Sequence, residues 1–186
     1  LKLAGSLVGY EPDECSFLIA TSGRYEYKNK GIDLFIEAVR RLKETYTGEK
    51  EIIAFVMVPA WSGNAREDLA LRMNAVENFK TALPDPFITH ALYNYNEDRV
   101  MSQIHNGGFS NRPEDKVKII FIPSYLKGDD GILNLSYYDV LIGLDATAFP
   151  SYYEPWGYTP LESIAFGVPT AVSYTHLRAH ETRSNL

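Results

Sequence analysis

The sequence predicts an α/β fold, a Rossmann-like doubly wound parallel sheet, and three observations support this. Apolar strand-like runs alternate with amphipathic helical runs along the chain. The run 52–59 is apolar almost throughout, which is typical of a strand buried on both faces of a parallel sheet. Polar segments rich in charge or glycine follow the first and fourth predicted strands, where ligands of such sheets bind. Repeated β-α alternation then predicts right-handed crossovers.

Five strands and five helices are expected along the chain. The strands are short apolar runs at 17–21, 52–59, 117–123, 146–150 and 168–172. The helices are expected at 31–46, 67–83, 96–105, 137–144 and 160–166. The clearest is 31–46, in which Leu34, Phe35, Ala38 and Leu42 recur at helical spacing. Trp61 follows a predicted strand end, a position that also allows a ligand-facing role, and we expect its ring to pack against the fold.

The composition limits the classes of protein to which the chain can belong. A length of 186 residues suits one domain with a core, and 45% hydrophobic with 23% charged residues is ordinary for a globular protein. A formal charge of −6 argues against a nucleic-acid partner, and no run is long and apolar enough to predict a membrane span. Cys15 is the only cysteine, which excludes an internal disulfide and suits the cytoplasm. The chain begins without methionine, which suggests a fragment.

The segment 149–162 is the most informative part of the sequence. It places Glu154 and Glu162 eight positions apart across a loop that opens a helix. Thr159 is expected to cap that helix and Pro160 to lie in its first turn. Free N–H groups at a helix start bind phosphate, and flanking carboxylates accept hydrogen bonds from hydroxyl groups. The segment therefore indicates a site for a nucleotide sugar.

The two carboxylates differ in how many interpretations they allow. The residues Thr159 to Glu162 also fit a capping box, in which Glu162 folds back onto the Thr159 N–H. The spacing alone leaves both interpretations of Glu162 open. Glu154 lies among aromatic residues in a Pro/Gly loop, where the loop conformation favours a functional role.

A basic loop at 22–31 follows the first predicted strand. Gly23 and Gly31 allow a sharp backbone path, Arg24 can donate two parallel bonds to a phosphate, and Lys30 adds a compact charge. Taken alone, the loop also fits a solvated charged turn. Because it lies at the same predicted sheet edge as 149–162, the two segments together favour a diphosphate site.

These two segments resemble glycogen synthases of the animal and fungal type. The resemblance rests on Ser-Gly-Arg-Tyr-Glu-Tyr-Lys-Asn-Lys-Gly with the following 32–38, and on 149–162, and it covers about 17–173. The middle segment, including 88–111, matches loosely and suits a bacterial relative. The resemblance implies a GT-B glycosyltransferase, of which this chain is most of the C-terminal, donor-binding domain. Such enzymes transfer glucose from UDP-glucose, or ADP-glucose, to an α-1,4-glucan with retention of configuration and without a metal.

The resemblance also implies residue roles. Arg24 and Lys30 match the diphosphate ligands, Glu154 the acid beside the donor glucose, and these three are the expected catalytic residues. The expected donor-binding residues are Arg24, Lys30, Tyr137 on the base, Glu154, Trp156, Gly157, Tyr158, Thr159, and Glu162 on the ribose. Tyr137 also fits a half-buried helix tyrosine. Asp145 departs from the family, which usually has histidine there.

The expected domain comprises residues 1–173, and 174–186 looks like a foreign, adapter-derived tail. His176 and His180 in that tail lack the further ligands of a metal motif, so no metal site is expected. The expected partners are a nucleotide-sugar donor and a glucan acceptor, without nucleic acid or membrane, and the full-length enzyme is expected to be a homo-oligomer. The alternatives are a retaining GT-B enzyme with another acceptor, and a non-catalytic nucleotide-sugar-binding module. The isolated chain is expected to be inactive, because acceptor-side residues lie elsewhere.

Overall fold

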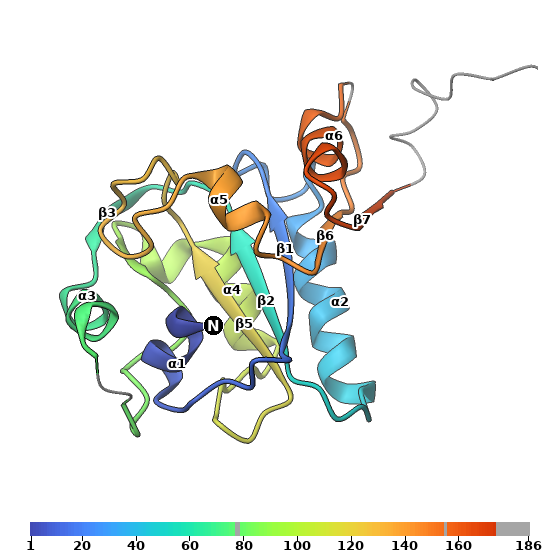
Figure 1. Cartoon of the computed structure of the whole chain (residues 1–186). Coiled ribbons are helices and arrows are strands. Elements are labelled where there is room, and N and C mark those ends of the chain that lie inside the picture. Colours follow the sequence, from blue (N-terminus) through green and yellow to red (C-terminus); the bar gives the residue numbers. More distant parts are fainter. Residues whose placement is uncertain (77–78, 155, 174–186) are drawn as a thin grey trace, which may run out of the picture.

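A computed structural model describes residues 1–76, 79–154 and 156–173 of the protein (Figure 1). Its centre is a five-stranded sheet in the order β5-β2-β1-β6-β7, with every neighbouring pair parallel. The strands are β1 (Phe17–Ser22), β2 (Ile52–Met57), β5 (Val117–Ile122), β6 (Ala146–Phe149) and β7 (Thr170–Val172). The prediction of a Rossmann-like doubly wound sheet is confirmed.

Helices cover both faces of the sheet. One face packs against α2 (Ile32–Thr45) and α4 (Arg99–Asn106), and the other against α1 (Lys2–Val8), α3 (Glu67–Asn74) and α5 (Tyr137–Leu141) (Figure 1). The last helix, α6 (Tyr158–Ala165), lies beside β6 and β7. No helix among the described residues is long and apolar enough to cross a membrane.

Strand β2 shows why the run 52–59 is apolar throughout. Ile52, Ala54 and Val56 face the core layer of α2 and α4, whereas Ile53 and Phe55 face the opposite layer. All six residues of β2 are buried. A strand that is buried on both faces has no solvent side, so the alternation of an exposed strand is absent.

The order of the strands determines where a ligand can bind. The chain runs from β1 outward through β2 to β5, and then returns to place β6 on the other side of β1. The strand order therefore reverses between β1 and β6, whose Ile19 and Ala146 are paired. The carboxyl ends of the strands at such a reversal form a crevice.

Some elements differ from the prediction. Helix α3 ends at Asn74 instead of continuing to residue 83. The segment that follows is held by tertiary contacts, because the Leu83 N–H donates to Leu7 O at 2.8 Å and Arg72 Nη1 donates to Thr81 O at 2.5 Å. Long-range bonds therefore override the helical pattern there.

The antiparallel pair β3 (Ser62–Ala65) and β4 (His90–Leu92), the short 3₁₀ helix η1 (Tyr95–Glu97) and helix α1 were not predicted. Each is short, with α1 spanning only 7 residues. Elements of this length carry too few repeats of a periodic pattern to be recognised from it.

A buried ion pair lies near the amino ends of β2 and β5. Lys118 is fully buried, and its Nζ donates to Glu51 Oε1 at 2.6 Å and to Asp115 O at 2.5 Å. Glu51 also accepts bonds from the hydroxyls of Tyr10 at 2.6 Å and Ser16 at 2.7 Å. Burial, followed by the bond to Glu51, raises the pKa of Tyr10. These bonds compensate the desolvation of both charges, so the network joins the N-terminal segment to the sheet.

Candidate functional site

A cavity of about 790 Å³ opens at the carboxyl ends of the strands, at the reversal between β1 and β6. It is lined by the segments that follow β1, β2 and β5 and by the segment that enters α6. The predicted site residues that line it are Arg24, Lys30, Tyr137, Glu154, Trp156, Tyr158, Thr159 and Glu162. Gly157 does not line the cavity.

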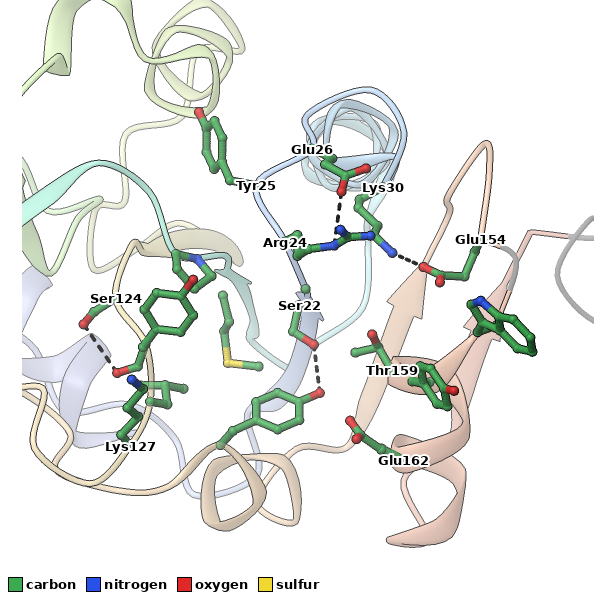
Figure 2. A pocket seen from close by; sticks show the side chains of 18 residues that line it. Ser22, Arg24, Tyr25, Glu26, Lys30, Ser124, Lys127, Glu154, Thr159 and Glu162 are labelled. Atoms are coloured by element: carbon green, nitrogen blue, oxygen red, sulfur yellow. Dashed lines mark hydrogen bonds and ion pairs between the residues drawn. The ribbon is translucent and has the colours of Figure 1, made fainter.

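The two predicted segments meet at an ion pair. Lys30, at the end of the β1–α2 loop, contacts the Glu154 carboxylate from the β6–α6 loop (Figure 2). Their side chains are only 12% and 10% exposed. Among the described residues, the Lys30 ammonium group and the Glu154 carboxylate have no other hydrogen-bond partner. A cation and an acid 124 residues apart are thus brought together at the cavity wall.

The close approach of these loops requires glycine at position 31. Gly31 has φ 63°, and a Cβ atom at this position would collide with the Pro150 carbonyl oxygen. The Tyr152 N–H also donates to Asn29 O at 2.9 Å. The backbones of the two loops therefore touch, which fixes Lys30 beside Glu154.

Two tyrosines hold the β1–α2 loop against α4. The Tyr25 hydroxyl donates to Asp98 Oδ2 at 2.6 Å, and the Tyr27 hydroxyl donates to Gln103 Oε1 at 2.6 Å. Asp98 is itself buried and caps α4. Burial, with the bond to Asp98, raises the pKa of Tyr25, so its hydroxyl stays a donor at neutral pH.

Arg24 extends from the loop that these tyrosines anchor. Its side chain is 80% exposed and its Nε lies 3.1 Å from Glu26 Oε1. Figure 2 shows Arg24 and Lys30 close together on the same side of the cavity, with Glu26 next to Arg24. An exposed guanidinium paired to one half-buried acid gains little from that pair, so it is available to an anion.

The start of α6 differs from the prediction. The helix begins at Tyr158, after Gly157 in the left-handed conformation with φ 60°, and no side chain caps it. Thr159 therefore lies inside the first turn, and the expected Thr159 cap is wrong. The left-handed Gly157 turns the chain into the helix two residues earlier than a threonine cap would. The N–H groups of Tyr158 and Thr159 consequently belong to the first turn, where intrahelical acceptors are lacking.

Glu162 does not form the capping box. Its Oε1 accepts a bond from the Tyr138 hydroxyl at 3.1 Å, across to helix α5. Figure 2 shows Thr159 and Glu162 on the same side of the cavity, one turn apart on α6. The carboxylate therefore lies at the cavity wall instead of folding back onto its own helix.

The adjacent residues Tyr137 and Tyr138 have different surroundings. Tyr137 lines the cavity, and its hydroxyl lies 2.9 Å from Ser22 Oγ at the end of β1. Burial raises its pKa. Tyr138 instead stacks on Phe166, with ring centroids 5.0 Å apart. Tyr137 is therefore half-buried, as one interpretation predicts, and it also lines the cavity. Its stacking on the base of the donor stays a prediction.

The far wall was not predicted. It is formed by Ser124, Tyr125 and Lys127 after β5, by Met57 at the end of β2 and by Pro59 after it. Figure 2 shows Ser124 and Lys127 on this side of the cavity. Lys127 Nζ lies 5.1 Å from the centroid of the Tyr125 ring. These segments follow predicted parallel strands and so reach the same sheet edge, which was the available signal.

Two further predictions concern positions outside the cavity. Asp145, where the resemblance implies a histidine, accepts the Leu18 N–H at 2.7 Å and has a structural bond to β1. Among the described residues, no group of three or more His, Cys, Asp or Glu side chains is placed to hold a metal ion. The proposed tail 174–186, with His176 and His180, lies outside the described residues.

A family model and individual known proteins that are similar to this chain are all glycogen synthases. The family model described as glycogen synthase matches residues 4–79 and 64–177. Glycogen [starch] synthase of Neurospora crassa is 29% identical over 215 residues, covering 87% of this chain and 30% of that protein. Isoform 2 of Saccharomyces cerevisiae is 32% identical, covering 83% of this chain and 30% of that protein. The liver enzyme of Mus musculus is 25% identical, covering 86% and 30%.

The chain spans about 30% of the length of these curated relatives. The family match nevertheless covers nearly all of the described residues, including both loops of the Lys30–Glu154 pair. The chain belongs to the glycogen synthase family of the animal and fungal type.

Proposed function

We propose that this chain forms the donor side of a glycogen synthase that transfers glucose from a nucleotide sugar to the non-reducing end of an α-1,4-glucan. The observation that carries the proposal is the Lys30–Glu154 pair at the strand reversal, beside Arg24 and the start of α6. A cation pair binds a diphosphate, and a nearby acid binds sugar hydroxyls. This arrangement suits UDP-glucose or ADP-glucose.

Lys30 and Arg24 have the central electrostatic role in this proposal. As the bond from glucose to the diphosphate breaks, negative charge grows on the leaving nucleoside diphosphate. Two fixed cations stabilise that charge, which is the task that a metal ion performs in other transferases, so we propose that no metal is needed. The diphosphate would replace Glu26 as the partner of Arg24 and share Lys30 with Glu154.

The remaining residues would hold the two ends of the donor. The N–H groups of Tyr158 and Thr159 point a positive helix end at the phosphates. Glu162 would accept the ribose hydroxyls, and Tyr137 would stack on the base, which suits uracil and adenine alike. Glu154 would bind the glucose hydroxyls and stabilise positive charge at the sugar, with retention of configuration. Trp156, which lines the cavity, and Gly157 would shape this loop.

The test is titration of the purified chain with UDP and with ADP by isothermal calorimetry. We expect saturable binding of one nucleotide that Arg24→Ala and Glu162→Gln each weaken by about tenfold, the loss of one charge-assisted contact. Arg41→Ala is the matched control for Arg24→Ala, because Arg41 is similarly exposed, at 73%, on the outer side of α2. Glu44→Gln, also on α2, is the control for Glu162→Gln.

The nucleotide that binds identifies the donor base. Folded protein that binds neither nucleotide, or that binds with equal affinity after both cavity substitutions, would contradict the proposed site. We also expect the chain alone to transfer no glucose, because a GT-B enzyme takes its acceptor side from a second domain. Measured turnover by this chain would contradict that expectation. For the full-length enzyme we propose a cytoplasmic homo-oligomer.

A transfer assay with glycogen as the acceptor distinguishes the proposed function from its two alternatives. A glycosyltransferase with a different acceptor would bind the same nucleotide, but the complete enzyme would fail to extend glycogen. A non-catalytic module would bind nucleotide sugar in the complete protein without turnover. Incubation of the complete gene product with labelled UDP-glucose or ADP-glucose and glycogen therefore decides among the three.

A further inference from the structure

A pair of exposed aromatic rings, Trp61 and Tyr93, is not among the residues that line the cavity. Trp61 is 69% exposed and Tyr93 is 68% exposed. Their ring centroids are 5.5 Å apart and their planes are tilted by 46°. The prediction that Trp61 packs into the fold is wrong: its ring contacts Tyr93 on the surface. We call Trp61 and Tyr93 the aromatic platform.

The backbone under the aromatic platform is well ordered by hydrogen bonds. Trp61 precedes β3 and Tyr93 follows β4, and the Tyr93 N–H donates to Trp61 O at 3.2 Å. Ser62 Oγ donates to Pro123 O at 2.8 Å, which ties the hairpin to the end of β5. Gly63 lies under the Tyr93 ring, where a Cβ atom would come within 3.4 Å of it. The backbone that carries the two rings is therefore held in place, which lowers the entropic cost of binding.

The aromatic platform lies close along the chain to residues that line the cavity. Pro59 lines the cavity, and Trp61 lies two residues further along the chain. The Ala60 N–H donates to Pro123 O at 3.1 Å, and Pro123 directly precedes the cavity residues Ser124 and Tyr125. The backbone that carries Trp61 is therefore bonded to the chain that forms this wall of the cavity.

The surroundings of the platform favour a neutral, hydroxyl-rich ligand. The segments 59–65 and 86–96 contain no Asp, Glu, Lys or Arg, although 23% of the whole chain is charged. A phosphate-bearing ligand would find no cation in either segment. Sugar rings are neutral, and their C–H faces pack on aromatic rings while their hydroxyls stay hydrated. An exposed aromatic surface of this kind marks a binding site.

The tilt between the rings distinguishes among glucans. A β-1,4-glucan is a flat ribbon, and it stacks best on coplanar rings. An α-1,4-glucan curves, so successive sugar rings change direction and match faces that are tilted by 46°. We propose that the aromatic platform binds an α-1,4-glucan chain at the rim of the donor cavity. This inference rests on the proposed function for its choice of ligand.

The test is titration of the purified chain with maltoheptaose, with cellohexaose as the flat-chain comparison. Trp61 and Trp156 are the only tryptophans in the sequence, so in a Trp156→Phe background the fluorescence reports on Trp61 alone. We expect maltoheptaose to change this fluorescence saturably and cellohexaose to bind more weakly. By calorimetry, Trp61→Ala and Tyr93→Ala should each weaken maltoheptaose binding by about fivefold, the contribution of one stacked aromatic face. Leu71→Ala, at a 74% exposed position on α3, should leave it unchanged.

UDP and ADP titrations of the same variants separate this inference from the proposed function. Trp61→Ala should keep nucleotide affinity, which also shows that the variant is folded. Maltoheptaose binding that survives both aromatic substitutions, or no binding by folded protein, would overturn the platform. Tighter binding of cellohexaose would overturn the choice of an α-glucan. Loss of nucleotide binding alone would count against the donor site and leave the platform standing.

Discussion

Two lysine–glutamate pairs with little-exposed side chains lie at opposite ends of the same sheet, and their surroundings differ. Lys118 and Glu51, near the amino ends of the strands, are 0% and 9% exposed, and Lys30 and Glu154, at the carboxyl ends, are 12% and 10% exposed. The exposed fractions of the side chains are therefore similar in the two pairs. The pairs differ in the other hydrogen bonds that their side chains make.

The Lys118–Glu51 pair is complete. Lys118 donates to Glu51 and to two backbone carbonyls, and Glu51 accepts from two hydroxyls as well. The Lys30–Glu154 pair has no such additional bonds among the described side chains, and it faces a cavity. A lysine with unused donors and a carboxylate with unused acceptors can bind a ligand, whereas a saturated pair can only stabilise the fold.

The largest expected effect follows from removing the saturated lysine. Lys118→Met should lower the free energy of unfolding by about 3–5 kcal/mol, because Glu51 is left buried without its cation. Urea denaturation measures this, with Lys116→Met at an exposed neighbouring position as the control. Nucleotide affinity of the protein that remains folded should not change. A loss below 1 kcal/mol would show that the network contributes little to stability.

The next effect concerns the contact that brings the second pair together. Gly31→Ala should cost about 1–3 kcal/mol for the left-handed backbone and abolish nucleotide binding, because the new Cβ would force the Pro150 loop away. Gly108→Ala is the matched control, since Gly108 has a similar φ of 66° but open space around its Cβ. If both variants bind nucleotide equally well, the loop contact does not position Lys30.

Removing the second lysine should change binding more than stability. Lys30→Met should weaken UDP or ADP binding by at least about tenfold and lower the unfolding free energy by less than about 1.5 kcal/mol, because water in the cavity can solvate Glu154. Calorimetry and urea denaturation of one preparation give both values. Lys28→Met is the control, because Lys28 is 67% exposed and pairs with Asp33 instead. A large loss of stability with unchanged nucleotide affinity would show that the Lys30–Glu154 pair, like the Lys118–Glu51 pair, only stabilises the fold.

The smallest expected effect is the response to salt. Raising NaCl from about 0.05 M to about 0.5 M should weaken nucleotide binding several-fold, because Arg24 is exposed and its attraction to a diphosphate is screened. The stability difference between the native protein and Lys118→Met should stay nearly constant over the same range, since that pair is shielded from ions. Calorimetry and denaturation at three salt concentrations test both. If nucleotide binding and the stability difference depended equally on salt, the proposed difference between the two ion pairs would be contradicted.

The sequence alone was enough to predict the fold class and the two loops of the candidate site. When a parallel sheet is buried on both faces, its strands consist of continuous apolar runs. All residues of β2 are buried and apolar in this way. Arg24, Lys30, Glu154 and Glu162 could be selected because their two segments are expected at the same edge of the sheet and because both segments resemble glycogen synthases.

Tertiary structure alone decided how these residues meet. It placed Lys30 against Glu154, started α6 after a left-handed Gly157 instead of at a Thr159 cap, and ended α3 early through bonds to Leu7 and Thr81. The saturation of Lys118 and the exposure of Trp61 were also hidden from the sequence. The physical reason is that hydrophobic periodicity is a local property of the chain. Partner choice, burial and backbone collisions depend on segments that are distant in sequence and come together only in the folded protein.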